Sequence, residues 1–334
     1  MGVLAVDIGA TKFAAAVARA PIESASYDES APSRSAPSAD IDDPAARSGS
    51  LSVLRHMRRV DVPSRGAWEA CRELLWQVVA AASADESCGT GEFEVTSIGI
   101  AAAGPVDIGV GSTAPLNIPE WRDGFPIVAA VRELFPEADI RFAIDGAALA
   151  LAEYRVGGLR GVRSGLAMTV SSGIGGGIVS DGRVLMGRTG NAGHVGHIVV
   201  PGWDVPCACG GVGCVEAVAS GMSSVRWARA QGWTGTTGME LARAAGAGDT
   251  IAAAALSRAG TALGQAISSA AAMLDVDRVV IGGGFAESGA PLWDPLRAAV
   301  VKHAGLGFIR QLRVLKSPIT DGATLVGAAA LATH

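Results

Sequence analysis

Two segments of the chain share one plan, and they lie about half a chain apart. Residues 3–18, VLAVDIGATKFAAAVA, predict an apolar strand, a glycine-containing turn and a second apolar strand. Residues 166–183, LAMTVSSGIGGGIVSDGR, repeat this plan with a turn that is richer in glycine. Two similar strand-turn-strand segments predict two related α/β lobes.

The length of the chain and the order of its other elements agree with two lobes. At 334 residues the chain exceeds the size at which one hydrophobic core usually stops growing. Helical and apolar strand patterns alternate, including a helix that begins at Asp145 and a last helix from about Ala323. We expect an N-terminal α/β lobe over residues 1–140 and a C-terminal α/β lobe over residues 141–334, with the last helix free to pack on the N-terminal lobe.

The segment from about residue 21 to residue 50 differs in composition from the rest. It is rich in Ser, Pro, Asp and Ala and contains few large apolar side chains. Such a segment buries too little apolar surface to order itself well. We interpret it as a low-complexity surface insertion in the N-terminal lobe.

Charge and hydropathy restrict the partners of the protein. The net charge is −5, and the lysines and arginines are scattered along the chain, which argues against nucleic acid and anionic membranes as main partners. No apolar run reaches the ~20 residues of a membrane span. The N-terminus, MGVLAVDIGATK, lacks the basic leader of a signal peptide. We therefore expect a cytoplasmic protein with small-molecule partners.

The first turn combines an acid with groups that can bind phosphate. Asp7, Gly9, Thr11 and Lys12 follow an apolar strand, and the glycine allows the backbone to approach a phosphate while hydroxyl and amide groups donate to it. A carboxylate at this place can hold Mg²⁺. A solvent-exposed hairpin with a polar tip explains the same residues equally well.

Glycine is concentrated in two further turns. Residues 171–177, SSGIGGG, contain four glycines, and residues 282–289, GGGFAESG, follow a buried strand. The first of these is neither a Walker loop nor a dinucleotide fingerprint, because no Gly-Lys-Ser/Thr follows and the next element is a strand. Three glycine turns at strand ends suggest a nucleotide that lies in a cleft between the lobes.

Three of the five cysteines are crowded into the segment CACGGVGC. These are Cys207, Cys209 and Cys214, and two histidines, His194 and His197, precede them. Three thiolates need one more ligand to complete a tetrahedral zinc site. The alternative is three unligated thiols near a turn, but close-set cysteines with glycine spacers in a reduced protein favour a closed, structural metal site.

These motifs together resemble the ROK family (repressor, open reading frame, kinase). DIGATK, GPVD, NIPEW, SSGIGGGIV and GHVGHIVV…CACGGVGCVEAVASG follow the family's landmarks over nearly the whole chain. The resemblance implies an actin-like, ribonuclease H-like α/β fold, and a kinase that transfers the γ-phosphoryl group of ATP to a hydroxyl of a hexose or hexose derivative, commonly O6. It also implies a homodimer or homotetramer. The residues expected to bind ATP and Mg²⁺ are Asp7, Gly9, Thr11, Lys12, Ser172, Gly173, Gly175, Gly283 and Gly284.

The resemblance also assigns roles in the sugar and zinc sites. The implied zinc ligands are His197, Cys207, Cys209 and Cys214. Asp145, which opens a helix, is the implied catalytic base, and its alternative role is an N-cap without chemistry. Glu216 is an implied sugar contact and would otherwise be read as a solvated helix residue. The full set of expected sugar contacts is Asn117, Asp145, His194, His197 and Glu216.

Three positions depart from the family's pattern. Ile144 stands where an asparagine usually contacts the sugar, and His194 stands where a glutamate usually does. An aliphatic side chain cannot form that hydrogen bond, and a neutral imidazole accepts once where a carboxylate accepts twice. Both changes should alter the choice of sugar more than phosphoryl transfer. Ala10, in place of a glycine, is tolerable if its φ is negative.

Two other functions compete with a kinase. A catalytically silent sugar-binding or regulatory protein is suggested by Ile144 and His194, although Asp7, Lys12 and Asp145 are retained. A sugar-responsive repressor is disfavoured, because the chain begins directly at the first phosphate motif, without an N-terminal helix-turn-helix.

Overall fold

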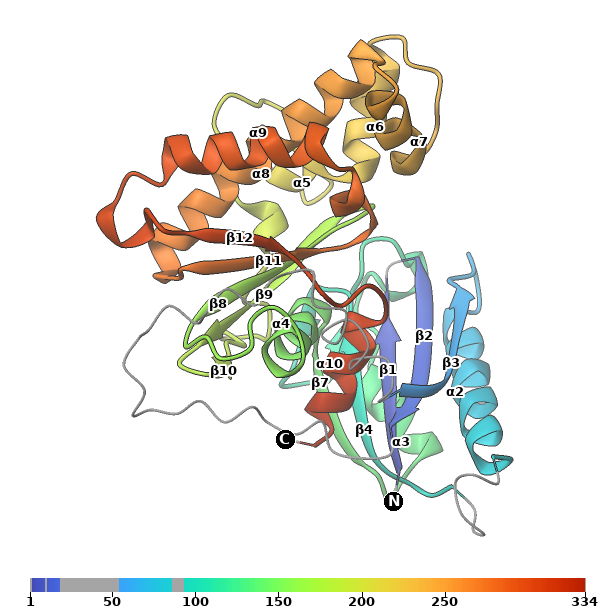
Figure 1. Ribbon diagram of the computed structural model, residues 1–334. Coiled ribbons are helices and arrows are strands. Elements are labelled where there is room, and N and C mark those ends of the chain that lie inside the picture. Colours follow the sequence, from blue (N-terminus) through green and yellow to red (C-terminus); the bar gives the residue numbers. More distant parts are fainter. Residues whose placement is uncertain (1, 10, 19–53, 86–92, 334) are drawn as a thin grey trace. The chain divides into compact units, whose positions relative to one another are not determined.

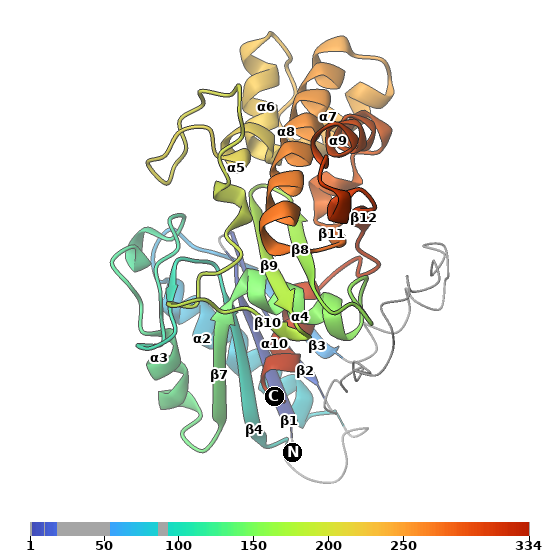
Figure 2. The ribbon, with the colours of Figure 1, turned by 90° about the vertical axis from the view of Figure 1, so that its left-hand side faces the viewer.

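The computed structural model describes residues 2–9, 11–18, 54–85 and 93–333, which form two units (Figures 1 and 2). The predicted insertion at 21–50 and the departure at Ala10 lie outside the described residues. Unit 1 comprises Met1–Gly161, Gly182–Gly193 and Pro318–His334, and unit 2 comprises Val162–Asp181 and His194–Ser317.

Unit 1 is built on a five-stranded sheet in the order β3-β2-β1-β4-β7. β1 pairs with β2 in an antiparallel hairpin and with β4 in parallel, and β7 runs parallel to β4. Its elements are β1 (Gly2–Ile8), β2 (Lys12–Ala18), β3 (Leu54–Asp61), α2 (Ala67–Ser83), β4 (Val95–Ala102), β5 (Val106–Asp107), β6 (Ser112–Thr113), η3 (Pro119–Trp121), α3 (Ile127–Leu134), β7 (Asp139–Ile144), α4 (Asp145–Arg155), β10 (Arg183–Val184) and α10 (Ala323–Leu331).

Both faces of this sheet are buried at β1 and β2, because these two strands carry apolar residues at successive positions. Leu4, Val6 and Ile8 point to the face that packs with α2 and α3, and the alternate residues of β1 and β2 are mainly alanines that pack with α4 and α10. The small side chains allow close approach. A Cβ on Gly99 of β4 would lie 1.7 Å from the carbonyl oxygen of Ala328 in α10.

Unit 2 has a sheet in which β9, β8, β11 and β12 follow one another. β8 and β9 form the second antiparallel hairpin, and β8, β11 and β12 are parallel. Its elements are β8 (Gly165–Val170), β9 (Ile174–Ser180), η4 (Val195–His197), α5 (Val215–Ala219), α6 (Gly221–Ala230), α7 (Gly238–Gly246), α8 (Thr250–Leu274), β11 (Arg278–Gly282), η5 (Gly284–Glu287), α9 (Ala290–His303), η6 (Gly307–Ile309) and β12 (Arg313–Lys316).

The core of unit 2 lies between one face of this sheet and its helices. Leu166, Met168 and Ile281 share one cluster with apolar residues of α5 to α9. α8 and α9 pack closely because Gly260 and Gly264 present no side chain, and a Cβ at either position would meet the backbone of α9 within 2.5 Å. The two glycine turns of unit 2 directly follow β8 and β11. Because these strands are parallel, both turns lie at the same edge of the sheet.

The structure divides the chain differently from the predicted boundary after residue 140. Residues 141–161 belong to unit 1, because α4 packs against α10 and β4. α10 also belongs to unit 1, where it contacts β1 and β4. Because α4 follows β7 directly, the composition does not change near residue 140. The sequence therefore did not show that unit 1 continues to Gly161.

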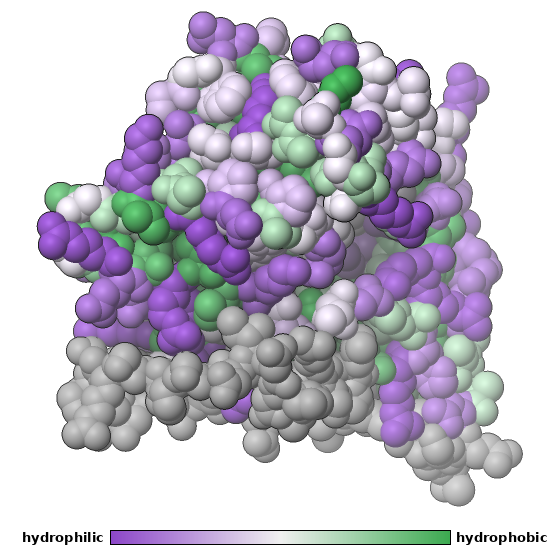
Figure 3. Space-filling view, turned by 45° about the horizontal axis from the view of Figure 1, so that its top comes forward, coloured by the Kyte–Doolittle hydropathy of each residue, from purple (hydrophilic) through white to green (hydrophobic). Residues whose placement is uncertain are grey.

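The described surface gives no sign of a membrane-spanning segment. None of the helices in the described ranges is long and apolar enough to cross a bilayer. On the face drawn in Figure 3, hydrophilic residues are interspersed with smaller groups of hydrophobic ones.

Candidate active site and metal centre

The first hairpin turn places four predicted residues together in unit 1. Asp7 is the second-last residue of β1, and Thr11 and Lys12 are exposed at the start of the return strand. Gly9 is required by a close approach, since a Cβ there would lie 2.6 Å from the carbonyl oxygen of Lys12. The turn therefore presents a carboxylate, a hydroxyl and an ammonium group beside tightly folded backbone.

Asp145 lies at the same edge of the sheet as Asp7. It directly follows β7, and β1, β4 and β7 are parallel, so their carboxyl ends share one edge. Ile144, buried at 3% exposure, occupies the N-cap position, and its side chain forms no capping bond. The backbone N–H of Gly146 donates to Asp145 Oδ1 at 2.7 Å. The Asp145 side chain is thus not the helix N-cap.

Both carboxyl groups hold a proton more tightly than a solvated carboxyl group does. Burial raises the pKa of Asp7 to about 7, the negative charge of Asp145 adds to this, and Arg59 opposes it. Burial also raises the pKa of Asp145 to about 6, against the effect of the Gly146 N–H. Nearby carboxylate oxygens in a partly buried place suit a hard cation such as Mg²⁺.

The turn between β8 and β9 contacts α5 of unit 2. The backbone N–H of Ile174 donates to Glu216 Oε2 at 2.8 Å. A Cβ on Gly173 would lie 2.8 Å from the same oxygen, so a larger residue there would displace the Glu216 carboxylate. Glu216 is half-buried and is therefore not a freely solvated helix residue.

The third glycine turn lies against the end of β8. Gly283 has φ +98°, and a Cβ there would lie 2.6 Å from the carbonyl oxygen of Val170. Both observations require glycine. Because β8 and β11 are parallel neighbours, the turns at Ser171–Gly173 and Gly282–Gly284 come side by side.

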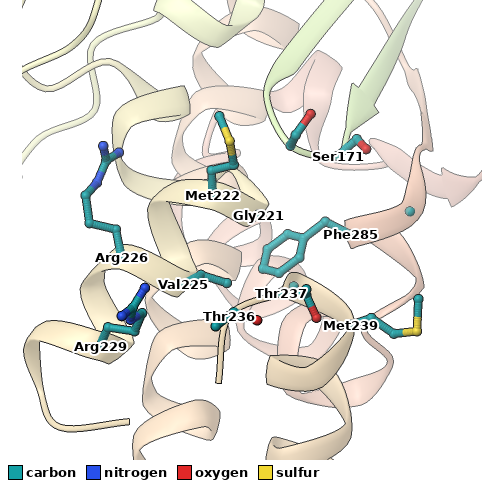
Figure 4. Close-up of a pocket in the computed structure, with 13 residues that line it drawn as sticks. Ser171, Gly221, Met222, Val225, Arg226, Arg229, Thr236, Thr237, Met239 and Phe285 are labelled. Carbon is teal, nitrogen blue, oxygen red and sulfur yellow. The ribbon is translucent and has the colours of Figure 1, made fainter. Parts of the chain in front are cut away.

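These two turns border a cavity of about 710 Å³ that lies within unit 2. Figure 4 shows the ring of Phe285 amid the labelled lining residues, with Arg226 and Arg229 coming from α6. Of the glycine-turn residues predicted for ATP, Ser172 and Gly284 line the cavity, whereas Gly173, Gly175 and Gly283 do not. The lining residues are Ser171, Ser172, Gly221, Met222, Val225, Arg226, Arg229, Thr236, Thr237, Gly238, Met239, Gly284 and Phe285.

Most of this lining was not predicted from the sequence, and it comes from α6 and from the start of α7. Ser220 caps α6 by accepting from Ser223 N–H. Thr237 and Glu240 form a capping box at the start of α7. This Thr-x-x-Glu spacing is a sequence signal that would have located α7. Two helix N-termini beside the cavity favour an anionic ligand group.

The four predicted metal ligands come together in unit 2. The candidate ligand atoms of His197, Cys207, Cys209 and Cys214 all lie within 4.8 Å of one another. His197 Nδ1 is 3.8 Å from Cys207 Sγ, and Cys209 Sγ is 3.7 Å from Cys214 Sγ. Zinc–sulfur bonds of about 2.3 Å in a tetrahedron give sulfur–sulfur edges of about 3.8 Å. The donor set and its spacing fit a closed zinc site.

His194 has a place separate from these ligands. Its ring centroid is 5.7 Å from that of His197, and its nitrogens are not among the four ligand atoms. Burial lowers the pKa of His194, and the charge of His197 lowers it further while Glu216 raises it. His194 is half-buried, next to Glu216 in unit 2.

The expected sugar contacts are divided between the two units. Unit 1 holds Asp145 and also Asn117, which is exposed in the turn before η3. Unit 2 holds His194, His197 and Glu216. Within unit 2 the structure thus brings the predicted sugar and zinc residues together.

Comparisons with known proteins identify the family of the chain. The ROK family model matches residues 57–334. The chain is 32% identical to a glucokinase of Aeropyrum pernix over 74% of this chain and 82% of that protein. It is 33% identical to an N-acetylmannosamine kinase of Escherichia fergusonii over 86% and 85%.

A solved structure supports the same assignment. The fold superposes on the crystal structure of a ROK family glucokinase from Streptomyces griseus in complex with glucose and AMPPNP, with a TM-score of 0.75, 27% identity and 99% coverage of both chains. The chain therefore belongs to the ROK family and has its actin-like α/β fold.

Proposed function

We propose that this protein is an ATP-dependent sugar kinase that transfers the γ-phosphoryl group of ATP to O6 of a hexose or hexose derivative. Sugar kinase activity is supported by relatives named glucokinase and N-acetylmannosamine kinase, and ATP by the AMPPNP complex. The single observation that carries the chemistry is Asp145, partly buried at the start of α4 at the same sheet edge as Asp7.

Asp145 acts as the general base. With a pKa of about 6 it is mostly ionised above pH 7, yet basic enough to take a proton as it leaves the attacking hydroxyl. The hydroxyl oxygen then forms a bond to the γ-phosphorus, and the bond from that phosphorus to the β–γ bridging oxygen breaks. The proton ends on Asp145, and ADP leaves with the bridging oxygen.

The cavity of unit 2 binds the nucleotide. Phe285, Val225 and Met239 offer apolar contact to a base, and the glycine turns allow backbone to approach phosphates. Mg²⁺, when bound, would neutralise charge on the phosphoryl oxygens. Asp7 is the residue that would hold it, directly or through water.

A structural zinc would fix the orientation of His197. Because Nδ1 is the nitrogen that lies beside Cys207 Sγ, it is the proposed ligand, and Nε2 remains free to bind a sugar hydroxyl. Glu216 holds the β8–β9 turn through Ile174 N–H with one oxygen and offers the other to the sugar. The Glu216 side chain would thus contact both the sugar and the β8–β9 turn.

The sugar itself is proposed as a hexose class rather than as glucose alone. Ile144 gives an apolar wall beside Asp145, and His194 offers an imidazole beside His197. Both features suit a modified or deoxy sugar, or one of different configuration. Asn117 completes the set of proposed contacts.

The test is sugar-dependent release of ADP from Mg-ATP by folded, zinc-loaded protein. The panel contains hexoses, N-acetylhexosamines and pentoses, and NMR of the product locates the phosphate. We expect a hexose or hexose derivative to stimulate ADP release, with the product phosphorylated at O6. If no sugar raises release above that of Asp145→Asn, the protein is not a kinase of these sugars and the proposed function is wrong.

A further inference from the structure

One arginine of unit 2 contacts three segments that lie near the candidate metal site, the nucleotide cavity and Glu216. The guanidinium of Arg258, on α8, lies 4.8 Å from the ring centroid of Trp203 and 5.7 Å from that of Trp227. Its Nη1 donates to the carbonyl oxygen of Val218 at 2.5 Å. α8 thus contacts all three segments through one side chain.

Each of the three segments carries a residue of the proposed machinery. Trp203 lies in the loop between the proposed zinc ligands His197 and Cys207. Trp227 follows Arg226, which lines the nucleotide cavity. Val218 lies two residues after Glu216 in α5, a helix of only five residues that ends where α6 begins.

Trp203 is held by α8 at a second point. Its indole Nε1–H donates to Gln265 Oε1 at 3.3 Å, and Gln265 lies two helical turns after Arg258 on α8. We call residues 198–206, between the proposed ligands His197 and Cys207, the zinc loop. Two contacts of the Trp203 indole hold this loop to α8: its face lies against Arg258, and its N–H donates to Gln265.

The contacts of the Arg258 side chain suit a cation better than an apolar side chain. Arg258 is partly buried, and it forms no ion pair within the described part of the chain. Two indole faces and the carbonyl of a helix C-terminus offset the loss of hydration of the guanidinium. A planar fork reaches all three partners at once, which a point charge cannot do.

We infer that Arg258 is a positioning residue that couples the metal centre and the Glu216 helix to the nucleotide cavity. This inference rests on the proposed function, because it gives the cavity to ATP. When the zinc loop is ordered, Trp203 holds the guanidinium, and the guanidinium in turn fixes the end of α5 and Trp227 of α6. Order in the zinc loop then favours the nucleotide-binding arrangement of α6.

The test compares binding of AMPPNP to the full chain, its zinc-loaded and chelator-stripped forms, and three variants. Arg258→Met removes the charge but keeps the length, and Arg258→Lys keeps the charge. Arg297→Met is the matched control, since Arg297 also lies over an indole of unit 2, 5.3 Å from the Trp293 centroid, and is not among the residues that line the cavity. Zinc content, thermal unfolding and tryptophan emission identify any variant that fails to fold.

We expect Arg258→Met to keep its zinc and to bind AMPPNP about five- to twentyfold more weakly, with partial recovery in Arg258→Lys. Stripping zinc should weaken AMPPNP binding to the wild type and to Arg297→Met, but should add little in Arg258→Met. Binding by folded Arg258→Met within twofold of the wild type would overturn the inference, as would full additivity of zinc removal and the substitution. Absence of AMPPNP binding by the wild type would instead count against the proposed function.

Discussion

In unit 1, β1 has β2 as its antiparallel neighbour and β4 as its parallel neighbour, and in unit 2, β8 has β9 and β11 in the same positions. The turns of the two hairpins differ in chemistry. The β1–β2 turn contributes the carboxylate of Asp7, whereas the β8–β9 turn contains no acid and its Ile174 N–H is bound by Glu216.

The difference separates the tasks of the two units. Unit 1 brings two carboxyl groups to one sheet edge, where burial raises the pKa values of Asp7 and Asp145. Unit 2 supplies a cavity, two helix N-termini and the candidate metal site. Under the proposed function, the first hairpin serves proton and cation chemistry and the second serves ligand binding. The predictions below test this division.

The largest expected effect is on turnover by Asp145→Asn. An amide keeps the shape of the side chain but cannot accept the proton, so kcat should fall about a thousandfold. Asp139→Asn, which changes an exposed carboxylate on β7, is the control and should leave kcat unchanged. Steady-state ADP release with the preferred sugar measures both. A fall of less than tenfold in Asp145→Asn would remove this residue from the role of base.

The next effect separates the two histidines of unit 2. His197→Ala should lose zinc and lower the melting temperature, because it removes one of four ligands. His194→Glu should keep about one zinc per chain and change the order of preferred sugars. Metal analysis of protein purified without chelator measures the zinc content of both variants, and the sugar panel measures the preference of His194→Glu. Equal loss of zinc from both variants would contradict the separate roles.

A smaller effect is expected at the third glycine turn. Gly283→Ala places a Cβ at positive φ and 2.6 Å from the Val170 carbonyl oxygen, so the turn must move away from β8. AMPPNP binding, measured by calorimetry, should weaken about tenfold while the zinc content stays unchanged. Gly305→Ala is the control, because a Cβ there meets nothing within 4 Å. Unchanged affinity in Gly283→Ala would mean that this turn does not shape the nucleotide site.

The smallest effect concerns the stability of unit 1 without ligands. The pKa of Asp7 is raised to about 7, so the folded state holds its proton more tightly than the unfolded state and loses stability as pH rises from about 4 to 7. Asp7→Asn should therefore unfold with a free energy about 1–3 kcal/mol higher at pH 8 and nearly equal at pH 4.

Denaturant unfolding at the two pH values measures this difference. Asp61→Asn, at an exposed carboxylate of β3, should change stability little at either pH. Equal stability of Asp7→Asn and the wild type at pH 8 would show that the Asp7 carboxylate is not disfavoured by burial.

Local patterns made much of the fold and part of the site predictable from the sequence. The apolar hairpins, the helix at Asp145 and the long helix α8, capped by Asp249, follow from periodicity and capping within a few residues. The crowded cysteines predicted the candidate metal site, because their close spacing in the chain already limits their distances in space.

The remainder depends on contacts between distant segments. The cavity lining at Thr237 and Phe285 comes from turns that sheet and helix packing bring together. The bond from Ile174 to Glu216 spans 42 residues. β3 was not predicted, since its polar residues, such as Arg58 and Arg59, give no apolar alternation, and it forms by pairing with β2 at a sheet edge.

The division between the units is tested most directly by AMPPNP binding to zinc-loaded Asp145→Asn beside its turnover. If unit 2 binds the nucleotide and unit 1 supplies the base, this variant binds AMPPNP with a Kd within about twofold of the wild type while its kcat falls about a thousandfold. Loss of AMPPNP binding in folded Asp145→Asn, or turnover close to that of the wild type, would contradict the account.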